Sequence, residues 1–174
     1  MIFRKIILSV LAISMLICVY AFTTRTTTTT YYLVRHAEKA CEDCSSCDLS
    51  ASGKARAAAL ADILAGKGID KIYASECLRT QRTAKPLADR LRRPVDVYQT
   101  GNLRDFIHSL KKTTHRNILV VGHSDQIPMI IHSIAHKKVF IPNSDFDNLF
   151  IIRKSGPGSG KTVLESTTYG AHSQ

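Results

Sequence analysis

Apolar and polar residues follow one another along this chain in two rhythms, one typical of strands and one typical of helices. Short runs rich in β-branched and aromatic residues, bounded by polar residues or glycines, predict buried strands. Apolar side chains at i, i+3, i+4 and i+7 predict amphipathic helices in the spaces between these runs. The predicted strands cover residues 31–34, 69–74, 95–98, 117–122, 148–153 and 161–165.

The predicted helices have recognisable start and stop signals. A side chain that can accept hydrogen bonds from the free N–H groups marks a helix start, and such residues are Ser50 or Ser52, Asn102, and Ser124 or Asp125. The first helix ends at Gly66 and Gly68. A further helix over 79–91 contains Pro86, which must lie near its start or kink it.

Strands and helices therefore alternate, and a hairpin through the glycine-rich stretch 155–160 ends the chain. This order predicts an α/β fold with a mostly parallel sheet and helices on both faces. In such a sheet, ligands bind outside the carboxyl ends of the strands. That edge is where the search for functional residues begins.

The N-terminal residues resemble a targeting segment more than a part of the fold. Arg4 and Lys5 precede an uncharged apolar run, residues 6–22, and small residues allow cleavage after Ala21. Residues 1–21 are therefore expected to be a signal peptide. The alternative is an uncleaved anchor formed by residues 6–22, which is at the short end of the lengths that span a bilayer.

A threonine-rich stretch separates this segment from the domain. Residues 22–30 are polar and of low complexity, and we expect a linker there, with the domain at 31–174. Whether the N-terminal segment is a signal peptide or an anchor, we expect the domain to be exported, to the periplasm or outside the cell. Membrane contact is expected only through the N-terminal segment, if it is uncleaved.

The formal net charge of +10 favours anionic partners. Phosphorylated substrates, nucleic acid and an acidic membrane surface all fit such a charge. No basic stretch interleaved with aromatic residues is present, so nucleic acid is not an expected partner.

The cysteines predict a disulfide. Cys41, Cys44 and Cys47 form a C-x-x-C-x-x-C run, and Cys77 follows. In an oxidising compartment the default for such a set is a disulfide, with the pairing open. Three closely spaced thiols without an adjacent histidine are an incomplete set of zinc ligands, so no metal is expected.

Two of the predicted parallel strands end in histidine. Arg35 and His36 follow the first strand, and His123 follows the strand 117–122. Arg79 opens the helix after the second strand, so it can reach the same edge. Arginine matches phosphate oxygens and keeps its charge, and a neutral imidazole can attack phosphorus. These residues predict phosphoryl transfer through a covalent phosphohistidine.

The motifs resemble those of the histidine phosphatase superfamily, branch 1, the phosphoglycerate mutase-like group. The segment 33–38 is similar to its R-H-G motif, with Ala37 in place of glycine. The L-S-x-x-G-x-x-R-A pattern is found at 49–57, and an S-x-x-x-R-T-x-x-T-A pattern at 75–84. Residues 122–124 resemble the second histidine motif. All of these segments occur in the order typical of the family.

This resemblance implies a three-layer α/β/α sandwich and a set of site residues. His36 would be the nucleophile, and Arg35, Arg79 and His123 would bind phosphate and stabilise the transition state. Ser124, at the start of the next helix, would join the substrate-binding residues. The family needs no metal and no cofactor, so none is expected.

The proton donor is the open point of the resemblance. Many members carry a glutamate after the third strand, but residues 99–105 contain none. Asp105 and Glu38 are the candidates for the general acid, with Asp125 as a rival. Asp105 lies where a carboxylate at a helix start also belongs.

The resulting expectation is an exported phosphatase acting on a phosphomonoester of a small molecule, or on phosphohistidine of a phosphoprotein. Two alternatives stay open: a non-catalytic phosphate-binding member of the same fold, and a pyrophosphatase acting on a cell-envelope precursor.

Overall fold

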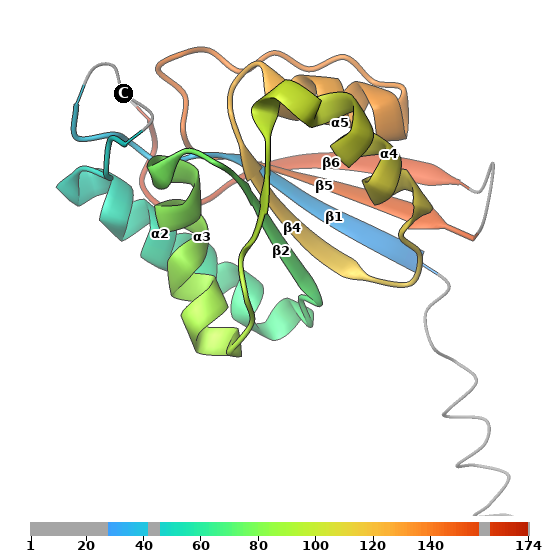
Figure 1. Ribbon diagram of the computed structural model, residues 1–174, viewed down its shortest axis with the longest axis horizontal. Coiled ribbons are helices and arrows are strands. Elements are labelled where there is room, and N and C mark those ends of the chain that lie inside the picture. The colour runs from blue at the N-terminus through green and yellow to red at the C-terminus, as the bar shows by residue number, and fades with distance from the viewer. Residues whose placement is uncertain (1–27, 42–45, 157–160, 174) are drawn as a thin grey trace, which may run out of the picture.

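The computed structural model describes residues 28–41, 46–156 and 161–173, and it contains a central sheet with helices on both faces (Figure 1). The strand order is β3-β2-β4-β1-β5-β6. Neighbours β3, β2, β4 and β1 are parallel, whereas β5 and β6 are antiparallel to their neighbours. The strands are β1 (Thr28–Arg35), β2 (Lys71–Ser75), β3 (Asp96–Tyr98), β4 (Asn117–Gly122), β5 (Asn148–Ser155) and β6 (Thr162–Thr168). The predicted α/β class and mostly parallel sheet are confirmed.

The helices form two layers. One layer is made by α2 and α3, and the other by α4 and α5 (Figure 1). Their bounds are α2 (Ala51–Leu64), α3 (Leu78–Leu91), α4 (Leu103–Lys112) and α5 (Gln126–Ala135), with short 3-10 turns at Ala65–Lys67 and Thr100–Asn102. The predicted three-layer sandwich is therefore present.

The central strand β1 builds a core on each side of the sheet. Tyr31 and Leu33 pack among the residues of α4 and α5. Tyr32 and Val34 point the other way and pack among those of α2 and α3. Successive side chains of a strand face opposite sides of its sheet, so an unbroken apolar run is what a strand covered on both faces requires.

Most helix starts agree with the predicted signals, but one proline does not. Ser50 is the N-cap of α2, and its Oγ accepts a hydrogen bond of 3.1 Å from the N–H of Gly53. Pro86 lies in the interior of α3 rather than near its start, so the first of the two places predicted for it is wrong. It costs the helix only one backbone donor, and the buried face of Ala84, Leu87 and Ala88 secures α3 against the sheet.

The threonine-rich stretch contributes to the sheet, which shortens the predicted linker. β1 begins at Thr28, and Thr30 pairs with Asn117 on one side and Arg153 on the other. Threonine is β-branched and suits a strand once partners are present on both sides. The domain therefore begins before residue 31, and residues 1–27, with the predicted leader, lie outside the described residues.

No helix in the described ranges is long and apolar enough to cross a membrane.

A disulfide closes the loop that follows β1. Cys41 and Cys47 are joined, with their Cα atoms 5.9 Å apart, and Lys39 forms a β-bridge with Leu49 beside them. Cys77 is a buried free thiol. Cys44 lies outside the described residues. The predicted disulfide is present, and its pairing, which the spacing left open, is Cys41 with Cys47.

The close approach of α2 to this loop predicts the effect of a single methyl group. A Cβ at Gly53 would lie 2.1 Å from the carbonyl oxygen of Glu38, a backbone atom that cannot move without moving the loop. We expect Gly53→Ala to lower the free energy of unfolding by about 2 kcal/mol or more, as overpacking does in buried sites. Urea unfolding followed by circular dichroism measures it.

The matched control is Gly66→Ala, where no atom lies within 4 Å of the added Cβ. It should leave the unfolding midpoint nearly unchanged. Equal effects of the two alanines would show that the contact at Glu38 does not limit the packing of α2.

Candidate active site

The functional residues meet because β2, β4 and β1 are parallel neighbours. Their carboxyl ends lie at one edge of the sheet, and Arg35 is in register with Gly122. The N–H of His36 donates a 2.9 Å hydrogen bond to the carbonyl of Gly122, which extends the pairing by one residue. The rings of His36 and His123 consequently lie 5.3 Å apart, edge to face. The structure brings together the two histidines that the sequence predicted.

His36 is held as a neutral base. Its side chain is almost completely buried, and Nδ1 donates a 2.8 Å hydrogen bond to the carbonyl of Ala37. A carbonyl only accepts, so the ring proton resides on Nδ1 and the lone pair on Nε2. Burial, and then the nearby charge of Arg35, lower the pKa of His36 to about 3. An unprotonated Nε2 is the form that can attack phosphorus.

The second histidine bridges Arg79 and Ser75. Nη2 of Arg79 lies 3.3 Å from Nδ1 of His123, and a guanidinium only donates, so Nδ1 accepts. Nε2 then carries the proton and donates to Oγ of Ser75 at 2.9 Å. Burial and the charge of Arg79 lower the pKa of His123 to about 4. The neutral ring is thereby held in one tautomer.

Hydrogen bonds behind His123 fix its orientation. Oγ1 of Thr80 lies 2.7 Å from the carbonyl of Cys77 and 2.9 Å from Oγ of Ser75. If the Thr80 hydroxyl donates to that carbonyl, it accepts from Ser75, and Ser75 accepts from His123. Ser75 ends β2, and Cys77 and Thr80 lie at the start of α3, the helix that also carries Arg79. The serine and threonine of the S-x-x-x-R-T motif therefore position the second histidine.

Arg35 joins the site to the loop before β5. Its Nη1 donates to the carbonyls of Pro142, Asn143 and Asp145 at 3.1, 2.8 and 3.0 Å. Its guanidinium carbon lies 4.0 Å from the centre of the Phe146 ring. Nε of Arg35 is buried and has no acceptor among the described residues. An anion bound beside His36 would offer this donor an oxygen.

Ser124 lies at the edge of the same loop. Its Oγ is 3.5 Å from Oδ1 of Asn143, the residue whose carbonyl accepts from Arg35. Ser124 precedes α5, whose first N–H groups face the carboxyl edge of the sheet, where a helix start favours an anion. The structure thus places all of the predicted phosphate-binding residues around one edge.

The candidates for the general acid lie in three different settings. Nε and Nη2 of Arg56 donate to the Glu38 carboxylate, at 2.7 to 3.0 Å. Asp105 is exposed in the first turn of α4. Asp125 precedes α5 without capping it through its side chain, and its charge acts to raise the pKa of His123. The ion pair with the buried Arg56 suits Glu38 to a structural role.

Three neighbours of the site were not among the predicted site residues. Ser75 belongs to a quoted motif, but its bond to His123 depends on the fold. Phe146 packs against the guanidinium group of Arg35 and the ring of His36, and the centroids of the Phe146 and His36 rings are 5.9 Å apart. Glu76 accepts from the N–H and hydroxyl of Thr100 at 3.0 and 2.6 Å. Nothing in the sequence around residue 146 signals a contact with a histidine more than a hundred positions earlier.

Glu76 adds a negative charge near His123. Burial acts to raise the pKa of Glu76, but hydrogen bonds from Thr100 outweigh burial and hold that pKa below its ordinary value. Its charge in turn acts to raise the pKa of His123. Thr100 lies in the segment after β3, where the family glutamate was sought, so Glu76, which directly follows β2, places a carboxylate against that segment.

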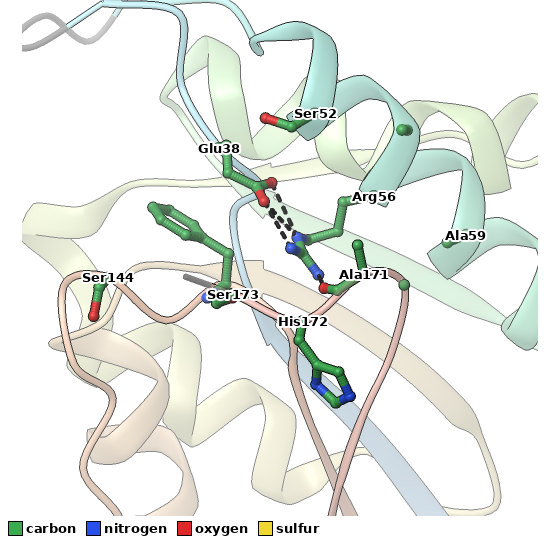
Figure 2. Close-up of a pocket in the computed structure, with 11 residues that line it drawn as sticks. Glu38, Ser52, Arg56, Ala59, Ser144, Ala171, His172 and Ser173 are labelled. Carbon is green, nitrogen blue, oxygen red and sulfur yellow. Dashed lines mark hydrogen bonds and ion pairs between the residues drawn. The ribbon is translucent and has the colours of Figure 1, made fainter.

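A cavity of about 600 Å³ lies beside the site, behind Phe146 (Figure 2). Figure 2 shows the pair of Glu38 and Arg56 on its wall, between α2 and the C-terminal residues. Nη1 of Arg56 also donates to the carbonyls of Tyr169 and Ala171 at 2.9 and 2.8 Å. Arg56 therefore secures the C-terminal segment and the loop after His36 rather than facing the phosphate-binding residues.

The family comparison covers the first half of this site. The model of the histidine phosphatase superfamily (branch 1) matches residues 31–107, a range that carries Arg35, His36 and Arg79. This part of the chain matches the model of that superfamily, in agreement with the resemblance seen in the motifs. No curated protein matches the sequence.

Solved structures extend the likeness over most of the chain. The protein histidine phosphatase SixA complexed with tungstate has a TM-score of 0.65 and 17% identity, covering 80% of this chain and 96% of that one. Phosphoserine phosphatase from Entamoeba histolytica, in complex with 3-phosphoglyceric acid, has a TM-score of 0.60 and 16% identity, covering 82% and 97%. At such identities the likeness shows the fold, which is phosphoglycerate mutase-like.

The buried neutral histidines predict how stability depends on pH. The folded pKa of His36, about 3, lies below its ordinary value of 6.5, so between these values the unfolded chain binds a proton that the folded chain does not. His123 acts in the same direction. Stability is therefore complete above about pH 6.5 and decreases as the pH falls. We expect Tm to drop by roughly 5 °C or more between about pH 6.5 and pH 5.

Differential scanning calorimetry of the native chain and of His36→Gln measures this dependence. The variant cannot take up the proton, so its Tm should fall less over the same range. Parallel curves for the two proteins would contradict the burial of a neutral His36.

The setting of Glu38 predicts that it stabilises the fold and does not donate the proton. Glu38→Gln removes the charge opposite a buried guanidinium and should lower the free energy of unfolding by about 2 kcal/mol. The turnover number for an aryl phosphate should change less than about threefold, whereas loss of a general acid costs about a hundredfold or more.

Arg56→Met is the matched variant, because it breaks the same pair from the other side. It should destabilise the protein without abolishing turnover. A loss of turnover in Glu38→Gln alone would return Glu38 to the role of proton donor.

Proposed function

We propose that this protein is an exported phosphatase that hydrolyses a phosphomonoester through a phosphohistidine on His36. The observation that carries the proposal is the hydrogen bond from Nδ1 of His36 to Ala37, because it directs an unprotonated Nε2 away from the backbone. Arg35 and Arg79 supply permanent positive charge on either side of the two rings. Positive charge so arranged stabilises the transferring phosphoryl group.

The reaction proceeds in two displacements. Nε2 of His36 attacks phosphorus, the P–N bond forms, and the bond to the ester oxygen breaks. The leaving oxygen takes a proton, and a water molecule then attacks phosphorus. The P–N bond breaks, inorganic phosphate leaves, and neutral His36 is restored. Burial favours an uncharged ring at the start and at the end of the cycle.

The charge of the bound phosphate offers a way to supply the proton. The pKa of His123 is low partly because Arg79 is adjacent. A phosphate dianion between the two would offset that charge and raise the pKa of His123, so that the ring becomes a donor. Glu76 and Asp125 act on His123 in the same direction. This route needs no carboxylic acid in the segment after β3.

Two kinds of substrate fit this chemistry. The similar structures include a protein histidine phosphatase and a phosphoserine phosphatase. A phosphohistidine on a protein surface and a small phosphomonoester both present a dianionic phosphoryl group to the arginines. Phosphate release from a panel that contains both therefore tests the proposal and ranks the two.

The decisive experiment follows phosphate release by the native chain, His36→Ala and His108→Ala. His108 is an exposed histidine of α4 and serves as the matched control. We expect release at least a thousandfold slower in His36→Ala and unchanged in His108→Ala. Rapid quenching should trap an acid-labile, alkali-stable phosphoenzyme in the native chain.

Circular dichroism of His36→Ala separates loss of chemistry from loss of folding. Undiminished release by a folded His36→Ala would exclude the phosphohistidine route. A folded native chain that binds phosphate and releases none from any substrate would favour the non-catalytic alternative.

A further inference from the structure

Basic residues gather at the edge of the sheet opposite the active site. This edge carries the amino ends of the parallel strands and the carboxyl ends of the helices. We refer to its lysines and arginines as the basic face, which consists of Lys67, Arg92, Arg93, Lys111, Lys112, Arg116, Lys137, Lys138, Lys154 and Lys161.

Hydrogen bonds and register place much of this set around the start of β1. The N–H of Thr30 donates to the carbonyl of Arg116 at 2.9 Å. Thr29 is in register with Lys154 on β5, and Lys161 follows across the hairpin, where its carbonyl accepts from Ser155. Figure 1 shows the start of β1, the loop from α4 to β4 and the β5–β6 hairpin at the same end of the sheet.

The other members surround this centre. Lys67 is joined to the start of β4 through its carbonyl, which accepts from Nδ2 of Asn117 at 2.8 Å. Arg93 donates to the carbonyl of Asp70 at 3.1 Å, beside the start of β2. The remaining residues end α3, α4 and α5 or follow them directly: Arg92, Lys111, Lys112, Lys137 and Lys138.

The carboxylates of the chain do not balance this charge. Beside the basic face, Asp70 is paired with Arg116 at 3.3 Å and Asp96 with Lys71 at 3.2 Å. Most other carboxylates of the described residues lie toward the active-site edge: Glu38, Asp48, Glu76, Asp105, Asp125, Asp145 and Asp147. Asp62 and Asp89, in the last turns of α2 and α3, are paired with Arg90 and Lys85, which are not members of the face. Basic residues therefore outnumber carboxylates at this end of the described part of the chain.

Helix dipoles explain only part of the basic face. A cation near a helix carboxyl end is favoured by the helix dipole, which suits Lys111 and Lys112. Lys154 and Lys161 flank a hairpin, so no helix end accounts for their position beside the others. A role of the surface as a whole accounts for the basic residues on the strands, the hairpin and the helices together.

The chain enters the domain on this face. β1 begins at Thr28, and the preceding sequence holds the uncharged apolar run 6–22, with Arg25 close to the domain. An apolar run of this length has high affinity for a bilayer. Basic residues beside a membrane segment are attracted to anionic lipid headgroups. The apolar run therefore precedes, in the sequence, the strand that begins on the positive surface.

We propose that the basic face docks on an anionic lipid surface. In this orientation the carboxyl edge of the sheet, with His36 and His123, faces away from the lipid and toward soluble phosphorylated molecules. The docking does not depend on the proposed hydrolysis, since it uses the opposite end of the sheet. In a chain that keeps its N-terminal segment, the folded domain would be a second membrane contact.

Vesicle binding by the full chain tests the docking. The basic-face variant carries Lys111→Gln, Lys137→Gln and Lys138→Gln, and the control carries Lys54→Gln, Arg82→Gln and Arg104→Gln near the active-site edge. Sedimentation compares vesicles of phosphatidylcholine alone with vesicles of phosphatidylcholine and phosphatidylglycerol. The apolar segment contributes to binding of both kinds of vesicle, so the ratio of the two affinities measures the contribution of electrostatic attraction.

We expect the basic-face variant to lower that ratio about tenfold or more, and the control, which loses the same charge, to lower it less than about twofold. Equal loss in both variants would reduce the effect to net charge and overturn the proposal, as would no loss in either. Tighter binding of the native chain to duplex DNA than to the anionic vesicles, at the same ionic strength, would also overturn it.

Discussion

The parallel pairing of β1 with β4 is the constraint on which the site depends. It places Arg35 opposite Gly122, so that the residues after both strands, His36 and His123, project from the same edge. A slip of one residue would turn every side chain of β1 to the other face of the sheet. The apolar run 31–34 is buried on both faces, which makes any other register costly. Core packing and the position of His36 are therefore one requirement.

Permanent positive charge lies next to the two histidines at this edge. Arg35 and Arg79 lie beside two rings that burial keeps neutral. Backbone carbonyls accept hydrogen bonds from Arg35, Ser75 pairs with His123, and Glu76 adds a negative charge near His123. One donor of Arg35, its Nε, still has no acceptor among the described residues. A bound anion would complete the set.

Local sequence patterns predicted the features that depend on residues close together in the sequence. The cap at Ser50, the bounds of β4 and the histidines at two strand ends follow from periodicity and residue chemistry. Contacts between distant segments could not be predicted in this way, as with Phe146 on His36 and Arg56 on the C-terminal residues. The start of β1 at Thr28 also depends on partners, because threonine forms a strand only where a neighbouring strand accepts it.

The two ends of the sheet differ for a reason rooted in the same topology. When parallel strands alternate with helices, all the helix amino ends lie at the carboxyl edge of the sheet and all their carboxyl ends at the opposite edge. Aligned dipoles then favour anions at the first edge and cations at the second. In this chain the first edge holds the histidines and arginines that suit phosphate, and the second holds Lys111, Lys112 and the lysines after α5. A substrate anion and an anionic surface can therefore be bound at opposite ends without competing.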